Sequence, residues 1–198
     1  LLGESLRQVN AAMAAFARRG WRSELIVCDN NSTDRTAEVA RAAGATVVFE
    51  PVNQIGRARN RGAEAATGDW LIFIDADTHP SAELFDDVAA QIATGRCLAG
   101  GSTIRLEDGY PAGNAITALW NGVSRTLRWF AGSFIFCETA AFQKLGGFNI
   151  NLFASEELEL SKRFKKLARI ERRKIVILHR HPILTSARKL RLYTPREH

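Results

Sequence analysis

The feature that most restricts the fold of this sequence is a regular alternation of short apolar segments with segments of helical periodicity over residues 1–93. The apolar segments, residues 24–28, 45–49 and 70–74, have the length and composition of buried strands. Helical patterns cover residues 2–19, 33–43, 57–66 and 81–93. Strands that are apolar on both faces predict a mostly parallel central sheet with helices on both faces, which is an α/β fold.

The second half of the sequence is less regular. A length of 198 residues fits one domain, since domains of about 100–200 residues are the rule. No repeat or low-complexity segment divides the chain, so we predict a single domain over residues 1–198. The elements that we expect in this half are strands over residues 97–105, 132–137 and 173–178 and helices over residues 114–130, 140–145 and 155–168.

Composition excludes several classes of protein. The chain is 46% hydrophobic and 24% charged, which is typical of a globular domain and not of a disordered or fibrous chain. No uncharged apolar run approaches the roughly 20 residues that a membrane-spanning helix needs. The three scattered cysteines, Cys28, Cys97 and Cys137, lie in apolar runs, which indicates buried thiols in a reducing compartment. We therefore expect a cytoplasmic protein.

Positive charge is concentrated near the C-terminal end. Residues 159–198 carry 13 Lys and Arg against 3 acidic residues, whereas residues 1–158 carry 14 against 18. Such a segment can face an anionic membrane surface, a phosphorylated substrate or nucleic acid, or it can be a solvated helix face. Nucleic acid is the least favoured partner, because residues 162–174 hold a single aromatic residue, Phe164, for stacking on bases. A peripheral position at the inner face of the membrane fits this charge.

Two polar groups follow strands of the predicted sheet. Asp29-Asn30-Asn31-Ser32 comes after the first apolar segment, and Asp75-Ala76-Asp77 comes after the third. Ligands of parallel α/β sheets bind at the carboxyl ends of the strands, so both groups are candidate binding residues. Two carboxylates at this spacing suit Mg²⁺ or Mn²⁺, which also bind substrate phosphates. A plain turn or a helix cap explains the same residues, and Ser32 is a candidate N-cap for the following helix.

Four segments together resemble the family 2 glycosyltransferases, which have the Rossmann-like GT-A fold. The segments are VCDNNSTDRTAEVA, GRARNRGAEAATGDWLIFIDADTHP, GGF and ASEELELSKRFKKL, and their order is more specific than any one of them. The resemblance covers about residues 2–192. It implies a nucleotide-binding half over residues 1–95, an acceptor-side half over 96–178 and a basic C-terminal segment over 179–198. The first strand of the family, with its nucleotide-binding loop, is missing from this sequence, which starts just beyond it.

The resemblance also implies an inverting enzyme that uses a nucleotide-diphospho-sugar donor, UDP- or GDP-linked, together with Mn²⁺ or Mg²⁺. Asp29 matches the acidic position beside the base of the donor, where a buried carboxylate accepts an N–H, and Asn31 is a further candidate for binding the nucleotide-sugar. The helix start that approaches the nucleotide carries Arg57, Arg59 and Asn60, and an arginine there can form two hydrogen bonds to the diphosphate or stack on the base. The less favoured alternative for Arg57 and Arg59 is that they are surface arginines on a helix.

The Asp-x-Asp group is the metal-binding motif in this resemblance. Asp75 matches the carboxylate that faces ribose and metal, Ala76 lies between, and Asp77 matches the direct metal ligand. His181 is a candidate third ligand, and a basic surface loop is the alternative for it and for His179. Arg188 and Lys189 lie where the family often has a basic pair that contacts the donor diphosphate or anionic lipid.

The catalytic base is implied to come from Glu156 and Glu157, with Glu157 favoured. This sequence has Glu-Glu where the family usually has Glu-Asp, so the choice between the two stays open, and two acids that only complement a helix dipole are the alternative. Gly132 and Ser133 are candidates for backbone contact with sugar or acceptor. Trp120 either lines the acceptor cleft or belongs to the core. The acceptor would be a saccharide or a lipid-linked molecule, as in the synthesis of cell-envelope polysaccharides or glycolipids.

Two other functions compete with sugar transfer. A nucleotidyltransferase on a similar α/β sheet would need a Gly-rich phosphate loop after the first strand, in the segment that this sequence lacks. A non-enzymatic module would bind anionic membrane or nucleic acid through the basic segment. The acidic pair at Glu156 and Glu157 favours the glycosyltransferase.

Overall fold

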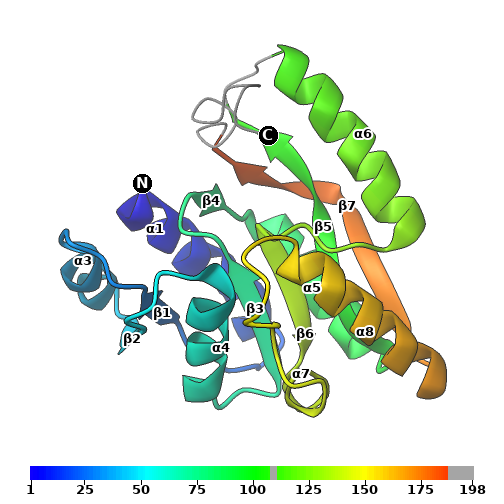
Figure 1. Cartoon of the computed structure of the whole chain (residues 1–198), viewed down its shortest axis with the longest axis horizontal. Helices are drawn as coiled ribbons and strands as arrows, with labels where there is room; N and C mark the ends of the chain where they lie inside the picture. The colour runs from blue at the N-terminus through cyan, green and yellow to red at the C-terminus, as the bar shows by residue number, and fades with distance from the viewer. Residues whose placement is uncertain (108–110, 187–198) are drawn as a thin grey trace.

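The strands form two sheets in the computed structural model of the chain, a parallel pair and a five-stranded mixed sheet (Figure 1). The structure describes residues 1–107 and 111–186. The pair consists of β1 (Ile26–Asp29) and β2 (Thr46–Phe49). The larger sheet has the order β3-β6-β5-β7-β4. Its strands are β3 (Trp70–Ile74), β4 (Thr78–His79), β5 (Cys97–Leu106), β6 (Phe134–Glu138) and β7 (Lys174–Thr185).

The pairing directions correct the expectation of a mostly parallel sheet. β1 runs parallel to β2, and β5 runs parallel to β7. β6 lies between β3 and β5 and runs antiparallel to both, and β4 is antiparallel to β7. The apolar patterns report that strands such as β6 are buried, but they carry no information on the direction of the neighbouring strand. In the described residues β3 belongs to the larger sheet and not to that of β1 and β2.

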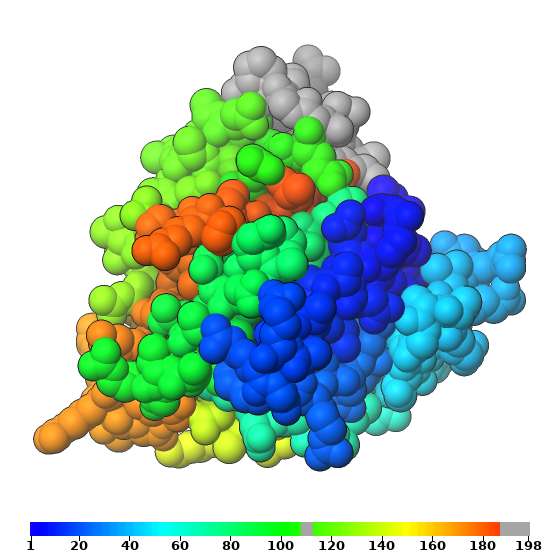
Figure 2. Space-filling view, turned by 180° about the vertical axis from the view of Figure 1, so that it is seen from behind, coloured from blue at the N-terminus to red at the C-terminus, as the bar shows by residue number. Residues whose placement is uncertain are grey.

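Helices cover both faces of the larger sheet, as predicted. On one face a core cluster joins Leu71, Leu98 and Ile135 of the sheet to Phe142 and Phe164 of two helices. On the other face the N-terminal helices and α5 pack against the sheet, as the rear view shows (Figure 2). The helices are α1 (Leu2–Ala12), α2 (Ala14–Ala17), α3 (Thr36–Ala42), α4 (Ile55–Ala65), α5 (Ala82–Ala93), α6 (Pro111–Leu127), α7 (Thr139–Lys144) and α8 (Glu156–Ile170).

Several boundaries differ from the sequence prediction. The segment expected as one helix over residues 2–19 is divided at Met13 into α1 and α2. Ser32 does not cap a helix, because α3 begins only at Thr36, whose backbone N–H donates to the carboxylate of Asp34 at 2.9 Å. The two-residue strand β4 was not predicted. In the part of the chain that is described, no helix has both the length and the apolar character needed to cross a membrane.

Candidate active site

Arg59 is the centre of the best-connected group of predicted site residues. Its Nη2 donates to Asp75 Oδ1 at 2.8 Å and to the carbonyl oxygen of Gly132 at 2.7 Å. Its Nη1 donates to Glu156 Oε1 at 2.9 Å. The side chains of Arg59, Asp75 and Glu156 are 10%, 19% and 7% exposed, so the two ion pairs are largely buried. The structure therefore brings α4, the turn after β3, the segment before β6 and the start of α8 to one place.

An aromatic ring and a glycine shape the space around Arg59. Its Cζ lies 5.2 Å from the centroid of the Phe148 ring, which is within cation–π distance. A Cβ on Gly132 would lie 3.2 Å from Arg59 Nη2 and 3.7 Å from Glu157 Cδ. Glycine at 132 therefore lets the main chain, the guanidinium and the carboxyl group of Glu157 come close together.

Glu156 and Glu157 have different surroundings, although both begin α8. Glu156 is 5% exposed and is paired with Arg59. Glu157 is half-buried, and burial raises the pKa of its carboxyl group. The neighbouring Glu156 raises that pKa further, while the charge of Arg59 lowers it. A raised carboxyl pKa in a polar cluster is typical of a general base.

The first turns of α8 are held by the protein core. Ser155, directly before the helix, has a φ of +61°, which is rare for a residue other than glycine. The buried hydroxyl of Ser161 donates to the carbonyl of Glu157 at 2.7 Å and accepts from the N–H of Phe130 at 2.9 Å. Further along the helix, Arg163 donates to the carbonyl oxygens of two residues in the turn after α7. These contacts fix the position of α8 relative to β6 and that turn.

The Asp75-Ala76-Asp77 segment forms the tight turn between β3 and β4. Asp75 and Asp77 are both half-buried, and Ala76 is exposed. The backbone of Asp75 is tied to the start of β6, since its N–H donates to the carbonyl of Ser133 at 3.4 Å. This turn places two carboxylate side chains on one short segment next to the Arg59 cluster.

The donor set of this turn fits a divalent cation of the Mg²⁺ or Mn²⁺ type. Asp75 and Glu156 both pair with the guanidinium of Arg59, and Glu157 follows Glu156 and is within range of the same charge, so three acidic side chains lie near one positive charge. No group of three or more metal-ligating side chains occurs within residues 1–107 and 111–186. Mg²⁺ is usually held by one or two carboxylates together with substrate phosphates and water, so two aspartates suffice.

His181 is not brought to the aspartates. It lies on β7, and its Nδ1 is 3.0 Å from the carboxylate of Asp87 on α5. The described residues contain no cluster of His181 with Asp75 and Asp77, so the prediction of a third metal ligand at this position is corrected. The sequence placed His181 after the last strand, whereas β7 continues through it and carries its side chain toward α5.

Asp29 and its neighbours form a closed turn after β1. The carboxylate of Asp29 accepts the N–H of Ser32 at 3.0 Å, and the turn passes through Asn31, which has a φ of +56° and an exposed side chain. Asn30 belongs to the polar group identified from the sequence after the first strand, but no role of its own was predicted for it. Its side chain nevertheless bonds two carbonyl oxygens of the loop after β2 and the N–H of Gln54, so it fixes the loop that enters α4.

Arg57 and Gln54 connect the start of α4 with the loop before α8. Arg57 Nε donates to Gln54 Oε1 at 3.0 Å, and Gln54 Nε2 donates to the carbonyls of Ile150 and Leu152. A hollow of about 310 Å³ lies between α4, the end of β2 and Ile150, and Arg57 and Asn60 are among its lining residues. Gln54 gave no sequence signal, because its partners are 96 and 98 positions away.

Asn60 is committed to the turn after α7. Its amide donates to the carbonyl of Phe148 at 2.9 Å and accepts the N–H of the same residue at 2.8 Å. Gly147 has a φ of +70°, and a Cβ there would lie 2.6 Å from Asn60 Oδ1. Glycine is therefore required at 147, and the amide of Asn60 holds the GGF turn.

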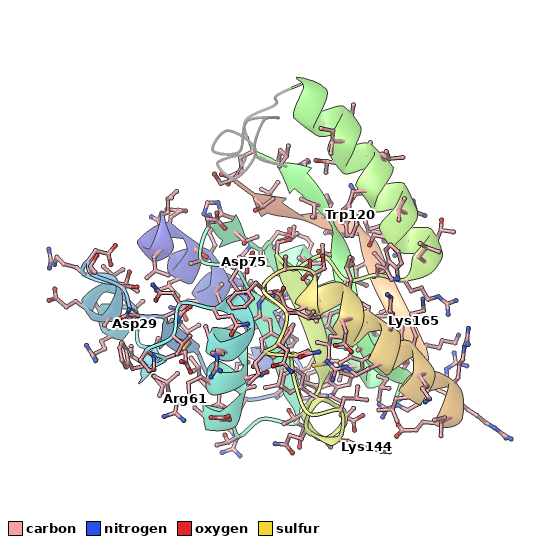
Figure 3. All side chains as sticks on the ribbon, viewed as in Figure 1. Asp29, Arg61, Asp75, Trp120, Lys144 and Lys165 are labelled. Carbon is pink, nitrogen blue, oxygen red and sulfur yellow. The ribbon has the colours of Figure 1, made fainter. Side chains whose placement is uncertain are left out.

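The remaining predicted residues are in different positions. Ser133 is 8% exposed and its hydroxyl has no hydrogen-bond partner among the residues that the structure describes. Trp120 is half-buried on α6, whereas Asp29 lies at the end of β1, on the other side of Asp75 (Figure 3). Arg188 and Lys189 lie outside the described residues.

Comparison with known sequences gives matches over most of the chain. A family model described as glycosyl transferase family 2 matches residues 2–148. An uncharacterised glycosyltransferase of Mycobacterium tuberculosis is 42% identical over 98 residues, which is 50% of this chain and 42% of the relative. A TPR repeat-containing protein of Synechococcus elongatus is 38% identical over 77 residues, or 38% of this chain and 19% of the relative. The chain thus spans less than half the length of these curated relatives.

Solved structures resemble almost the whole chain. Staphylococcus aureus TarS in complex with UDP-GlcNAc has a TM-score of 0.64 at 19% identity, with 92% of this chain and 56% of that chain covered. A Pyrobaculum calidifontis mannosyltransferase in complex with GDP-Man and Mn²⁺ has a TM-score of 0.62 at 19% identity, with 90% and 53% covered. Glucosyl-3-phosphoglycerate synthase of M. tuberculosis, with Mn²⁺, UDP-Glc and phosphoglyceric acid, has a TM-score of 0.61 at 21% identity, with 92% and 68% covered. At such identities the likeness shows the fold alone.

Proposed function

Because the chain belongs to glycosyl transferase family 2 and has the GT-A fold, we propose that it transfers a sugar from a nucleotide-diphospho-sugar to an acceptor hydroxyl, with inversion at the anomeric carbon. The observation that carries this proposal is the Arg59 cluster, which places the Asp75-Ala76-Asp77 turn beside the two glutamates of α8. When a hydroxyl displaces a diphosphate, a metal ion can stabilise the leaving diphosphate and a carboxylate can accept the proton of the hydroxyl. An aspartate turn that could bind the metal, next to a glutamate that could be the base, suits this reaction.

The donor side consists of Asp29, Arg57 and the aspartate turn. UDP- and GDP-linked sugars are the donor classes, because structures of the same fold contain UDP-GlcNAc, UDP-Glc or GDP-Man. Asp75 and Asp77 would hold Mn²⁺ or Mg²⁺. Such an ion, when bound, neutralises charge on the leaving diphosphate. Arg57 would bind the diphosphate or stack on the base, since its guanidinium is half-buried beside the hollow at α4.

Glu157 is the better candidate for the base. Glu156 is already paired with Arg59 and is 5% exposed, so it has little freedom to reach an acceptor. Glu157 is more exposed, and burial and its acidic neighbour raise its pKa, which strengthens it as a proton acceptor. Its carboxyl group also lies beside Gly132, where the main chain allows close approach of a ligand.

The reaction then has a simple balance of bonds. The acceptor oxygen attacks the anomeric carbon from the face opposite the diphosphate, and its proton passes to the carboxylate of Glu157. The bond between the anomeric carbon and the diphosphate oxygen breaks, and the electron pair leaves with the nucleoside diphosphate. Glu157 contributes by holding the proton, while Arg59 and Ser161 keep the first turn of α8 in place.

Binding of UDP and GDP to the full chain by isothermal titration calorimetry, with and without Mn²⁺, tests the donor site. We expect one nucleotide to bind only with Mn²⁺, and the Asp77→Ala variant to lose that binding. Asp86→Ala is the matched control, because Asp86 pairs with Arg18 on the rear helices. If neither nucleotide binds in the presence of Mn²⁺, the proposal is wrong.

Turnover of the nucleotide-sugar tests the base. Release of nucleoside diphosphate from a panel of UDP- and GDP-sugars, with water or a simple saccharide as acceptor, needs no knowledge of the natural acceptor. We expect Glu157→Gln to reduce this rate at least about 100-fold while nucleotide binding is kept, in line with the usual contribution of a general base. Glu171→Gln, at the far end of α8, is the control. An unchanged rate in Glu157→Gln would exclude it as the base.

A further inference from the structure

We propose that Arg59 is a positioning residue, which fixes Glu156 and Asp75 in place so that Glu157 alone is left to take the proton of the acceptor. This inference rests on the proposed glycosyl transfer. The sequence pattern suggested instead that Arg59 binds the donor diphosphate, with Arg57 and Asn60. The geometry separates these residues, because the guanidinium of Arg59 is directed to three groups of the protein itself.

The contacts of Arg59 leave it little capacity for a ligand. A guanidinium has five N–H donors in a fixed plane, and both of its terminal nitrogens here bond protein oxygens. One face of the plane lies near the Phe148 ring, and the side chain is 10% exposed. The planar guanidinium makes three hydrogen bonds to the protein, which fix its orientation. It therefore also fixes the orientation of the carboxylates that it binds.

The effect on Glu157 follows from helix geometry. Successive residues of an α-helix project about 100° apart, since the helix has 3.6 residues per turn. Glu156 is held against Arg59, so the direction of Glu157 is set by the same contact. One turn further along the helix, the hydroxyl of Ser161 accepts the N–H of Phe130, which fixes α8 relative to the segment before β6.

Arg59 also connects the base to the donor side. Its Nη2 holds Asp75 of the aspartate turn, and its Nη1 holds Glu156, so one side chain sets the spacing between the two parts of the site. Arg57 makes no comparable contact with these carboxylates in the described structure, since its Nε donates to Gln54. Of the two arginines at the start of α4, we therefore assign Arg57 to binding of the donor.

The test separates kcat from KM for the nucleotide-sugar. We expect Arg59→Lys, which keeps the charge but loses the fork, and Arg59→Gln to lower kcat about 100-fold, because a misplacement near 1 Å costs about that much. The donor KM should stay within about threefold of wild type, because Asp75 is also held by its backbone N–H, which donates to the carbonyl of Ser133. Arg173→Lys is the matched control, because Arg173 also pairs with a glutamate, Glu138, and a backbone carbonyl, that of Cys97, but at the opposite end of the strands from Asp75. It should leave kcat unchanged.

Two outcomes of the single substitutions at Arg59 would overturn the proposal. A raised KM with an unchanged kcat would mean that Arg59 binds the donor, and an unchanged kcat and KM would mean that it has no role. If Arg59→Gln fails to fold, the double variant Arg59→Met/Glu156→Leu replaces the pair by apolar groups and leaves neither member of it unpaired. It should fold, bind nucleotide and show the same low kcat, and a wild-type kcat in this variant would also overturn the proposal. Absence of turnover in the wild-type chain would instead contradict the proposed function.

Discussion

Neighbouring residues of this chain differ in role because of partners that lie far away in the sequence. Glu156 and Glu157 are identical in type and adjacent, yet Glu156 is paired with Arg59, 97 positions earlier, and Glu157 is not. Arg57 and Arg59 differ in the same way. The sequence motifs marked all four residues as candidates, but they could not assign a role to each one, because a role depends on the partners that the side chain has in the folded chain.

At this scale we predict the pH dependence of turnover. Glu157 must be ionised to accept a proton, so kcat/KM falls as the pH drops through its pKa. Burial and Glu156 raise that pKa, so the acidic limb should lie above the value of about 4.3 that is usual for glutamate. In Glu156→Gln the limb should move to lower pH, because the like charge is removed while Arg59 keeps an oxygen acceptor.

The measurement is a pH profile of nucleoside diphosphate release for the wild type and Glu156→Gln. Glu171→Gln serves as the control, since Glu171 lies beyond the opposite end of α8 and pairs with Lys144. A limb at the same pH in all three proteins would contradict the assignment of Glu157 as the titrating base.

The elements of the fold were predicted better than their connections. The apolar patterns alone predicted the positions of β1, β2, β3 and α5, because each of these segments has a strong apolar pattern and is followed by residues that end it. β4 was missed because a strand of two residues is too short to show a periodic pattern. The predicted end of β7 was too early, because the strand is extended through residues 179–185 by pairing with β4 and β5. The order of strands in the larger sheet depends on contacts distant in sequence, which no local pattern reports.

The anchoring of α8 gives a prediction about stability. Ser161 is fully buried, and its hydroxyl joins the N–H of Phe130 to the carbonyl of Glu157. Ser161→Ala should lower the free energy of unfolding by about 1–3 kcal/mol, because the N–H of Phe130 is left buried without a partner. Urea denaturation followed by circular dichroism measures this. The exposed Ser23→Ala should change stability by less than about 0.5 kcal/mol, and equal effects of the two variants would contradict the role of Ser161.

On the scale of the whole molecule, basic residues collect on the outer side of α8. Lys162, Lys166 and Arg169 are exposed at intervals that share one helix face, and Ile170 beside them is 70% exposed. We expect the chain to co-sediment with vesicles of phosphatidylglycerol and phosphatidylcholine, but not with phosphatidylcholine alone.

Neutralising this face should weaken vesicle binding. Each basic residue near an anionic surface contributes about 1 kcal/mol, so the triple change to Gln at the three positions should lower the partition coefficient about 100-fold. The control replaces Arg35 and Arg41, exposed at the two ends of α3, by Gln. Binding that is equal in the two variants would exclude α8 as the membrane-facing element.

The cysteines report on the integrity of the whole fold. Burial raises the pKa of Cys28 to about 11 and of Cys97 to about 12, and it raises that of Cys137 as well. Because the thiolate is the reactive form, the native protein should react very slowly with a disulfide reagent at a pH of about 8. All three thiols should react after unfolding in urea. Rapid reaction of one thiol in the native protein would show that its part of the core opens.

The hydrogen bonds of Arg59 span 16, 73 and 97 positions of the chain. The two longer separations close long loops, which costs loop-closure entropy and contributes to a high contact order. A chain that is still being synthesised has the aspartates of the turn long before it has the glutamates of α8. The site is therefore assembled as a late event of synthesis, and a nascent chain that has not yet reached Glu156 cannot contain it.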